Sequence, residues 1–277
     1  MTQSELSMAI EWAAQEGWNP GISDASSFYL ADPNGFFISK LGDQTVAVIS
    51  AVRYGEQFGF IGLYIVHPDY RGRGFGWEIW QVATNYLQDI PIGLDGVVAQ
   101  QSNYKKSGFE FANRNIRYSG RSKKIKIESD STDGSIVSLD QIPFSMIQAF
   151  DRSFFPQDRA GFLSSWISQP DSFALALIAD GAICGYGVIR PCRVGFKIGP
   201  LFANSEFAAE KLYSSLCACV DNDSPIFLDI PECNLRAVAL VHRHQMQPMF
   251  ETARMYKGYV GNVRIEDTYG ITSFELG

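Results

Sequence analysis

Apolar positions in residues 1–119 alternate between helical and strand-like spacing. After Thr2-x-x-Glu5 they recur every three to four positions, which is typical of an amphipathic helix that begins at a capping box. Later apolar runs are short and separated by Gly42-Asp43 and Gly55-Glu56, which predicts strands joined by hairpin turns. We expect helices over 3–16, 24–31, 74–89 and 103–107, and strands over 35–40, 45–53, 58–66, 94–99 and 109–119.

The rest of the chain repeats this order of helices, three strands, helix, strand, helix and strand. The repeat is visible locally, because 107–120 and 245–258 each run from a turn into a strand that ends in an aromatic residue and glycine. The polar stretch 120–135 separates the copies, so the sequence predicts an α+β protein with domains at 1–128 and 136–277. The second copy should have helices over 143–155, 159–168, 205–220 and 234–244, and strands over 173–179, 182–190, 194–201, 226–230, 248–258 and 271–276.

Composition narrows the class of protein. The 277 residues are 46% hydrophobic, which allows a sizeable core, and no apolar run reaches the roughly 18 residues of a membrane-spanning helix. The N-terminus lacks a signal-peptide pattern, and the odd number of cysteines, five, favours reduced thiols in a cytoplasmic protein. Cys217-x-Cys219 has no matching second pair, so we expect no metal site.

Charge is distributed unevenly along the chain. The net charge of -7 argues against a general nucleic-acid binder. Residues 101–126 nevertheless carry eight basic side chains and one acidic side chain, Glu110. This segment is either a site for a polyanionic ligand or a solvated strand and linker.

A glycine-rich turn between an expected strand and an expected helix carries the most specific chemistry. It reads Arg71-x-x-Gly74-x-Gly76. Such a turn leaves backbone N–H groups free at a helix N-terminus, which favours phosphate, and Arg71 and Arg73 add positive charge. The spacing matches neither the dinucleotide fingerprint Gly-x-Gly-x-x-Gly nor the nucleotide P-loop.

A second motif, Tyr104-x-x-x-Gly108-Phe109, follows on the next helix and strand. The two motifs, with Val66 and Pro68 before the turn, resemble the GCN5-related N-acetyltransferase (GNAT) superfamily. This resemblance implies two tandem GNAT-like domains, each with a mixed, mostly antiparallel central sheet flanked by helices, and acetyl-CoA as the cofactor. Resemblance to the tandem type extends to 18–21, 190–192, 197–201 and 272–277.

The resemblance also assigns roles around the turn. The strand before the turn should splay from its neighbour, offer its backbone to pantetheine and polarise the thioester through an N–H group. Tyr104 occupies the position at which many members of the family have a general acid that protonates the departing thiolate. Because a tyrosine pKa is about 10 and a thiol pKa about 8.5, we expect it to donate a hydrogen bond rather than a proton. The expected cofactor-binding residues are Leu63, Tyr64, Ile65, Val66, Arg71, Gly72, Arg73, Gly74, Phe75, Gly76, Asn103, Tyr104 and Lys106.

No general base stands out, and Asp24 and Glu56 are the candidates. The second copy lacks the glycine turn and has Val241 at the position equivalent to Tyr104. The first copy should therefore bind acetyl-CoA, and the second copy should form the wall of the acceptor cleft. The predicted function is transfer of an acetyl group to a small-molecule amine by direct attack, in a monomer or homodimer. The alternative is a non-catalytic acyl-CoA-binding sensor. Candidates for acceptor binding are Trp18, Asn19, Tyr29, Tyr64, Arg190, Cys192, Lys197 and Asp229.

Overall fold

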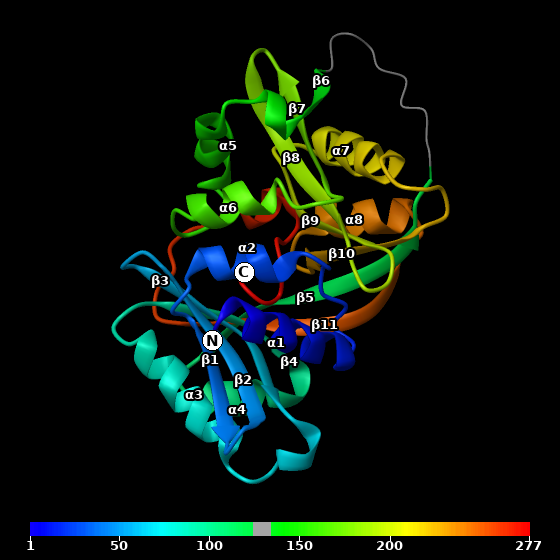
Figure 1. The fold of residues 1–277 in the computed structure, drawn as a ribbon. Helices are drawn as coiled ribbons and strands as arrows, with labels where there is room; N and C mark the ends of the chain where they lie inside the picture. Colours follow the sequence, from blue (N-terminus) through cyan, green and yellow to red (C-terminus); the bar gives the residue numbers. More distant parts are fainter. Residues whose placement is uncertain (124–133) are drawn as a thin grey trace.

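A single mixed sheet runs through both halves of the molecule. The structure, a computed structural model, describes residues 1–123 and 134–277. Within these ranges eleven strands lie in the order β1-β2-β3-β4-β11-β5-β10-β9-β8-β7-β6, and a twelfth strand, β12, pairs with β9 beside this path. Figure 1 shows the first half (blue to cyan) below the second half (green to orange).

The elements follow the predicted order in each half. The first half contains α1 (Gln3–Gln15), α2 (Asp24–Ala31), β1 (Phe36–Leu41), β2 (Gln44–Tyr54), β3 (Phe58–Val66), α3 (Phe75–Tyr86), β4 (Ile92–Val97), α4 (Gln101–Lys106) and β5 (Glu110–Arg121). The second half contains β6 (Ser135–Ser138), α5 (Phe144–Asp151), α6 (Ala160–Trp166), β7 (Phe173–Ala179), β8 (Ala182–Pro191), β9 (Phe196–Ala203), α7 (Glu206–Ala218), β10 (Pro225–Pro231), α8 (Leu235–Arg243), β11 (Gln247–Lys257) and β12 (Thr268–Gly270). The α+β class is therefore confirmed, and β6 is a strand that the sequence pattern did not predict.

The two halves exchange their last long strands. Strand β11 lies between β4 and β5, and β5 in turn pairs with β10. Each half thus completes its sheet with a strand from the other half, and the two sheets become one. The exchange brings residues of β11 next to β4 of the first half.

Helices cover both faces of the sheet in the first half. Successive side chains of β2 point to opposite faces, and each face packs against helices. Val48 and Val52 belong to the core beneath α1 and α2, whereas Ala47, Ile49 and Ala51 belong to the core beneath α3. The helix α1 begins as predicted, with the side chain of Thr2 accepting from the N–H of Glu5 in a capping box.

The core of the first half continues into the second. Phe28 of α2 stacks on Trp166 of α6 with ring centroids 5.9 Å apart, and the Trp166 indole donates to the Gly199 carbonyl at 2.9 Å. Phe58 and Phe155 also meet across the two halves. The relative position of the halves is therefore fixed by buried aromatic contacts.

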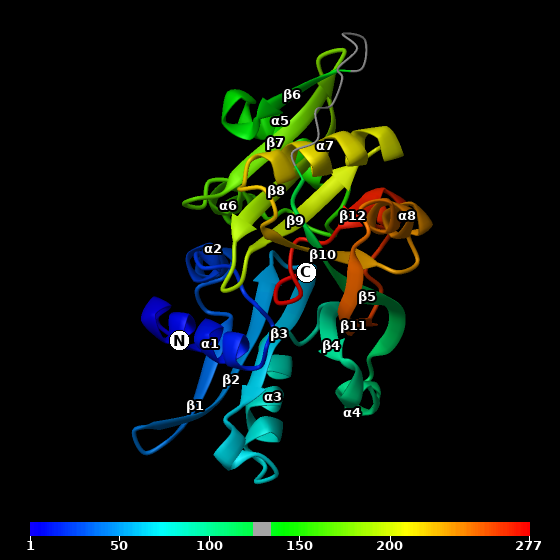
Figure 2. The ribbon, with the colours of Figure 1, turned by 90° about the vertical axis from the view of Figure 1, so that its right-hand side faces the viewer.

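The prediction of a last strand over 271–276 is wrong. The strand β12 ends at Gly270, and residues 271–277 form a bend and a turn. Their apolar side chains are buried because this tail lies between the two halves, where both Figure 1 and Figure 2 show it in red. Burial explains the apolar composition without strand pairing, since the N–H of Leu276 donates to the Ser273 hydroxyl instead.

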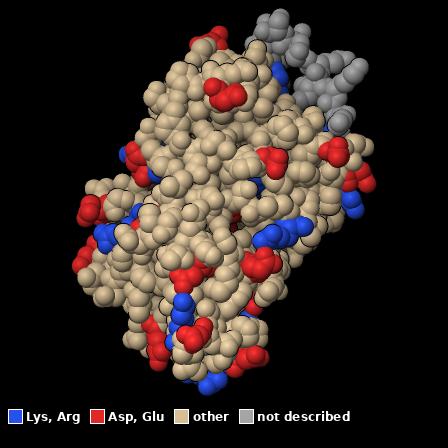
Figure 3. Space-filling view, in the orientation of Figure 1, with Lys and Arg blue, Asp and Glu red and all other residues tan. Residues whose placement is uncertain are grey.

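Three basic side chains of the segment 101–126 are paired within the fold. Arg114 pairs with Glu232 and Glu251, Arg117 pairs with Asp229, and Arg121 lies 3.7 Å from Asp223. Lys124 and Lys126 lie outside the described residues. Figure 3 shows acidic and basic side chains interspersed on one face, whose centre is mostly uncharged. Among the described helices, none combines the length and the apolar character that crossing a bilayer requires.

Candidate active site

Strands β3 and β4 separate halfway along their length. Their parallel pairing extends only from Gly59 and Ile92 to Ile61 and Leu94, although both strands continue beyond that point. On its other side β3 bulges against β2, where the register shifts next to Ser50. Leu63 sits in this bulge with a φ of 45°, a left-handed value that is uncommon for leucine. The bulge turns the end of β3 away from β4 and opens the sheet, as the sequence predicted.

A cavity of about 410 Å³ occupies this opening. One end reaches Arg71 beside the glycine turn, and the middle is bounded by residues 61–66 of β3 and 94–97 of β4. The other end is formed by Trp18 and by four residues brought in from the second half, which are Phe250, Thr252, Phe274 and Glu275. A second cavity, also of about 410 Å³, shares Tyr64, Gln100 and Tyr104 with the first and adds Trp77, Trp80, Asn103, Lys106 and Ser107.

The glycine turn is open at its backbone. Gly72 and Gly74 have φ values of 74° and 93°, and a Cβ built on either would meet nothing within 4 Å. Gly74 precedes α3 without a side-chain cap, so the first N–H groups of this helix are not capped by a side chain. Arg71 is half-exposed; it pairs with Glu16 and donates through Nε to the Val66 carbonyl at 3.0 Å. Uncapped N–H groups, an accessible backbone and two arginines fit the phosphates of an acyl-CoA.

Tyr104 lies where the two cavities meet. Its ring packs on Trp80 with centroids 5.4 Å apart, and a Cβ on Gly96 would come within 2.2 Å of it. Burial raises the pKa of its hydroxyl, so Tyr104 stays protonated at neutral pH. Its hydroxyl makes no hydrogen bond to any described residue. This environment suits the hydrogen-bond donor that the sequence predicted.

Glu275 is a cavity-lining carboxylate that the sequence analysis did not single out. Four buried side-chain polar atoms of the described residues lack a hydrogen-bond partner, and two of them, Thr252 Oγ1 and Glu275 Oε1, belong to residues that line this cavity. Buried polar atoms are nearly always paired in folded proteins, so two unsatisfied polar atoms in the wall at this end of the cavity are unusual. Burial raises the pKa of the Glu275 carboxyl. The ending 272–277 was already part of the family resemblance, but nothing in it showed that the tail folds back onto β3.

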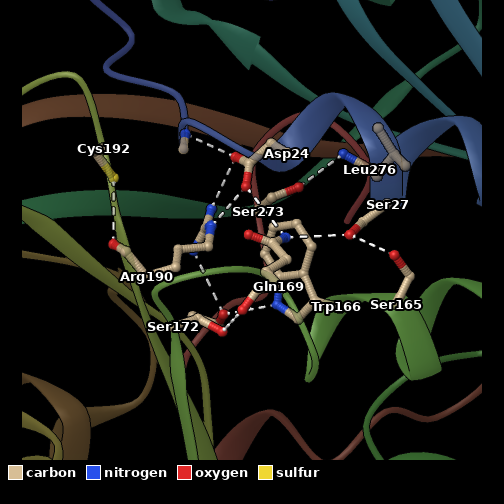
Figure 4. A network of polar contacts seen from close by, with 12 residues as sticks. Asp24, Ser27, Ser165, Trp166, Gln169, Ser172, Arg190, Cys192, Ser273 and Leu276 are labelled. Atoms are coloured by element: carbon tan, nitrogen blue, oxygen red, sulfur yellow. Dashed lines mark hydrogen bonds and ion pairs between the residues drawn. The ribbon is translucent and has the colours of Figure 1, made fainter. Parts of the chain in front are cut away.

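Several predicted acceptor residues form a buried charged cluster instead of lining the cavity. Asp229 accepts a forked pair of bonds from Arg117 at 2.6 and 2.7 Å, and Asp24 accepts from Arg190 at 2.8 and 3.2 Å. Figure 4 shows Asp24 facing Arg190, with Gln169 close to its carboxylate. Cys192 and Lys197 are buried beside this cluster.

Of the other residues predicted to bind the acceptor or to act as the base, Trp18 and Tyr64 line the cavity and the rest do not. Glu56 is exposed in the turn between β2 and β3, 4.0 Å from Arg53. Asn19 exchanges hydrogen bonds with the backbone of Val194, and Tyr29 packs against Phe36. Asp24 is fully buried in its ion pair. Neither Asp24 nor Glu56, the two predicted bases, is among the residues that line the cavity.

The second copy opens its sheet in the same place and fills the opening with its own chain. Parallel pairing of β9 with β10 ends at Ile198 and Leu228. Strand β12 then pairs with β9 at Leu201 and Phe202, and the next N–H, that of Ile271, donates to the Asp229 carbonyl of β10 at 2.9 Å. The position equivalent to the first cavity is therefore occupied by residues 268–271.

A sheet that is open beside an arginine- and glycine-rich turn in one copy, and filled by its own chain in the other copy, fits a tandem GNAT protein. Two family sequence models agree: "Acetyltransferase (GNAT) family" matches residues 5–109 and "Acetyltransferase (GNAT) domain" matches residues 147–270. The chain belongs to the GNAT acyltransferases as a tandem two-domain type.

Individual relatives match over nearly the full length. A holothin acyltransferase from Pseudoalteromonas sp. (strain SANK 73390) is 28% identical over 99% of this chain and 92% of its own length. A crystal structure from Pyrococcus horikoshii, assigned to the acetyltransferases, superposes with a TM-score of 0.83 at 23% identity over 100% of this chain and 94% of that one. A tandem GNAT protein of the clavulanic acid biosynthesis pathway gives a TM-score of 0.65 at 11% identity over 95% and 98% of the two chains.

Proposed function

We propose that the protein transfers an acetyl group from acetyl-CoA to the amine of a small molecule by direct attack. The observation that carries this proposal is the continuity of the cavity. It runs from Arg71 of the glycine turn, past the end of β3 that has no β4 partner, to an end lined by the aromatic residues Trp18, Phe250 and Phe274. A donor entering from the turn and an acceptor entering from the other end would meet beside the β3 bulge.

The chain's own groups account for binding and polarisation. The backbone of 71–76 and the Arg71 and Arg73 side chains would hold the phosphates, and residues 63–66, which have no β4 partner, would hold the pantetheine arm. Bound acetyl-CoA supplies the electrophilic thioester carbonyl. A backbone N–H in the β3 bulge would polarise this carbonyl, and the protonated Tyr104 would donate to the sulfur as charge develops there.

The acceptor end favours a flat amine. Three aromatic residues, Trp18, Phe250 and Phe274, line it together with Thr252. Aromatic rings prefer to stack on planar partners. The relative that carries the name holothin acyltransferase supports an acceptor of small-molecule type.

Turnover with a panel of amines tests the proposal. Acetyl-CoA should be consumed in the presence of flat aromatic amines, with holothin included in the panel. Free coenzyme A and the acetylated product should appear in equal amounts by mass spectrometry. Binding of acetyl-CoA without transfer to any member would contradict the proposal and favour the sensor.

Replacing Tyr104 by Phe should lower kcat about 10-fold, the value of one lost hydrogen bond. The fold should be retained, because the hydroxyl bonds to no described residue. The KM for acetyl-CoA and the pH profile should change little, since the tyrosine stays protonated over the working range. A Tyr118→Phe variant is the control, because Tyr118 lies on β5 and is not among the residues lining the cavity. Equal rates for Tyr104→Phe and the wild-type chain would exclude Tyr104 from the reaction.

A further inference from the structure

We propose that Glu275, on the C-terminal tail of the second copy, is the general base that takes the proton from the acceptor amine. This inference rests on the proposed function and names the residue that the sequence motifs left open. It follows from the cavity lining, from the path of the tail and from the charges around the carboxyl group.

Three carboxylates line the cavity, and two of them are already paired. Glu16 pairs with Arg71. Asp95 accepts from Arg254 at 2.9 and 2.6 Å and from Asn115 at 2.8 Å. Glu275 forms no ion pair with any described residue, and its Oε1 atom has no hydrogen-bond partner. It is thus the lining carboxylate that no described side chain pairs with.

The tail holds Glu275 against the bulge of β3. A Cβ on Gly62 would lie 2.0 Å from the Glu275 carbonyl oxygen, so the two backbones are in direct contact and only glycine fits. The tail is anchored on both sides of this contact. The N–H of Ile271 donates to Asp229 at 2.9 Å, and Tyr54 donates to the Leu276 carbonyl at 3.0 Å. Glu275 therefore lies beside Leu63, where the sheet opens.

Charged groups on four other elements act electrostatically on the Glu275 carboxyl. They are Lys197 of β9, Asp24 of α2, Arg117 of β5 and Arg190 of β8. Arg117 and Arg190 are each neutralised by a forked carboxylate, whereas Lys197 donates no hydrogen bond to any described residue. Burial and Asp24 raise the pKa of Glu275, and Lys197 is the main group that opposes this rise. Lys197 thus limits the rise in the pKa of Glu275, although burial also lowers the pKa of Lys197 itself.

The step balances within the site. The amine nitrogen forms a bond to the acetyl carbon, and the carbon–sulfur bond breaks with its electron pair leaving on sulfur. The nitrogen gives one proton to the Glu275 carboxylate, which releases it to solvent before the next cycle. The thiolate of coenzyme A leaves with a hydrogen bond from Tyr104 and takes a proton from water. No oxidant or further reactant is required.

The Glu275→Gln variant tests the assignment by its rate. Its kcat with an amine turned over by the wild-type chain should fall about 100-fold or more, the usual contribution of a general base. The KM for acetyl-CoA should stay within about 3-fold, because the turn is untouched. Glu266→Gln is the matched control, since Glu266 is an exposed glutamate on the same C-terminal segment.

The pH profile separates a base from a structural residue. Wild-type activity should fall as the pH drops through the raised pKa of Glu275, because the carboxyl then becomes protonated. Lys197→Met should move this acidic limb to higher pH. A Glu275→Gln rate within about 3-fold of the wild-type rate, or an unmoved limb in Lys197→Met, would overturn the assignment and leave the proposed function intact.

Thermal unfolding gives a readout that needs no substrate. Because the folded pKa of Glu275 is raised above its unfolded value, the wild-type chain loses stability as the pH rises through the folded pKa. The Tm of Glu275→Gln should therefore exceed the wild-type Tm by an amount that grows with pH, whereas Glu266→Gln should follow the wild-type chain. A pH-independent difference would overturn the assignment even if no acceptor were turned over.

Discussion

Replacing Asp24 by Asn should lower the free energy of unfolding by about 3–5 kcal/mol, because it leaves a buried guanidinium without its counter-ion. Asp24 and Arg190 are both fully buried, and their forked pair connects α2 of the first half with β8 of the second. The guanidinium of Arg190 also lies 4.2 Å from the Trp166 ring. Chemical denaturation of the two chains, with midpoint and slope compared, measures the loss.

Glu11→Gln is the control for this prediction. Glu11 pairs with Arg193 at 2.6 Å and also connects the first half to the second, but both side chains are partly exposed, at 53% and 38%. An exposed pair of this kind contributes at most about 1 kcal/mol. Equal losses in the two variants would show that Asp24 does not hold the halves together.

Replacing Gly74 by Val should weaken acetyl-CoA binding about 100-fold, close to 3 kcal/mol. Two effects combine at this position. A β-branched residue is strained at a φ of 93°, and its side chain would project from the backbone that is to approach the phosphates. Calorimetric titration of acetyl-CoA measures the change in Kd.

Gly181→Val separates the two effects. Gly181 lies in the turn between β7 and β8 with a φ of 75°, and a Cβ there also meets nothing within 4 Å. Both variants should therefore lose a similar amount of stability, but Gly181→Val should bind acetyl-CoA with the wild-type Kd. If Gly74→Val bound equally well, the turn would not be the phosphate site.

Local patterns in the sequence predicted local structure well. The capping box at Thr2 and Glu5 depends on neighbours in the chain, so spacing and residue type were sufficient. The splayed strand before the turn was implied by the family resemblance, and the structure has it. The same holds for the α+β order of the two copies, because apolar periodicity is set by each element's own exposure.

Contacts between distant segments could not be predicted in the same way. The exchange of β5 with β11 depends on how the two halves pair with each other. The sequence pattern of both strands would be the same if each strand stayed in the sheet of its own half. Glu275 is 213 positions after Gly62 in sequence yet touches it in space, and the only local sign was a glycine at position 62. The buried pairs of Asp24 and Asp229 also join remote elements, which is why both were expected to face a cleft.

The second copy shows why only one cofactor site is expected. Both copies open their sheets after a short parallel pairing, but residues 268–271 fill the second opening with backbone hydrogen bonds of the kind pantetheine would make. The same segment continues as the tail that carries Glu275 to the first opening. One stretch of chain thereby closes the second site and completes the first.

Calorimetric titration of the wild-type chain with acetyl-CoA tests the central claim most directly. The claim is that the β3–β4 opening is the functional acyl-CoA site and that β12 closes its counterpart. We predict one acetyl-CoA bound per chain, with this single binding event weakened in Gly74→Val and unchanged in Gly181→Val. Two equivalents per chain, or one equivalent that Gly74→Val leaves unchanged, would contradict it.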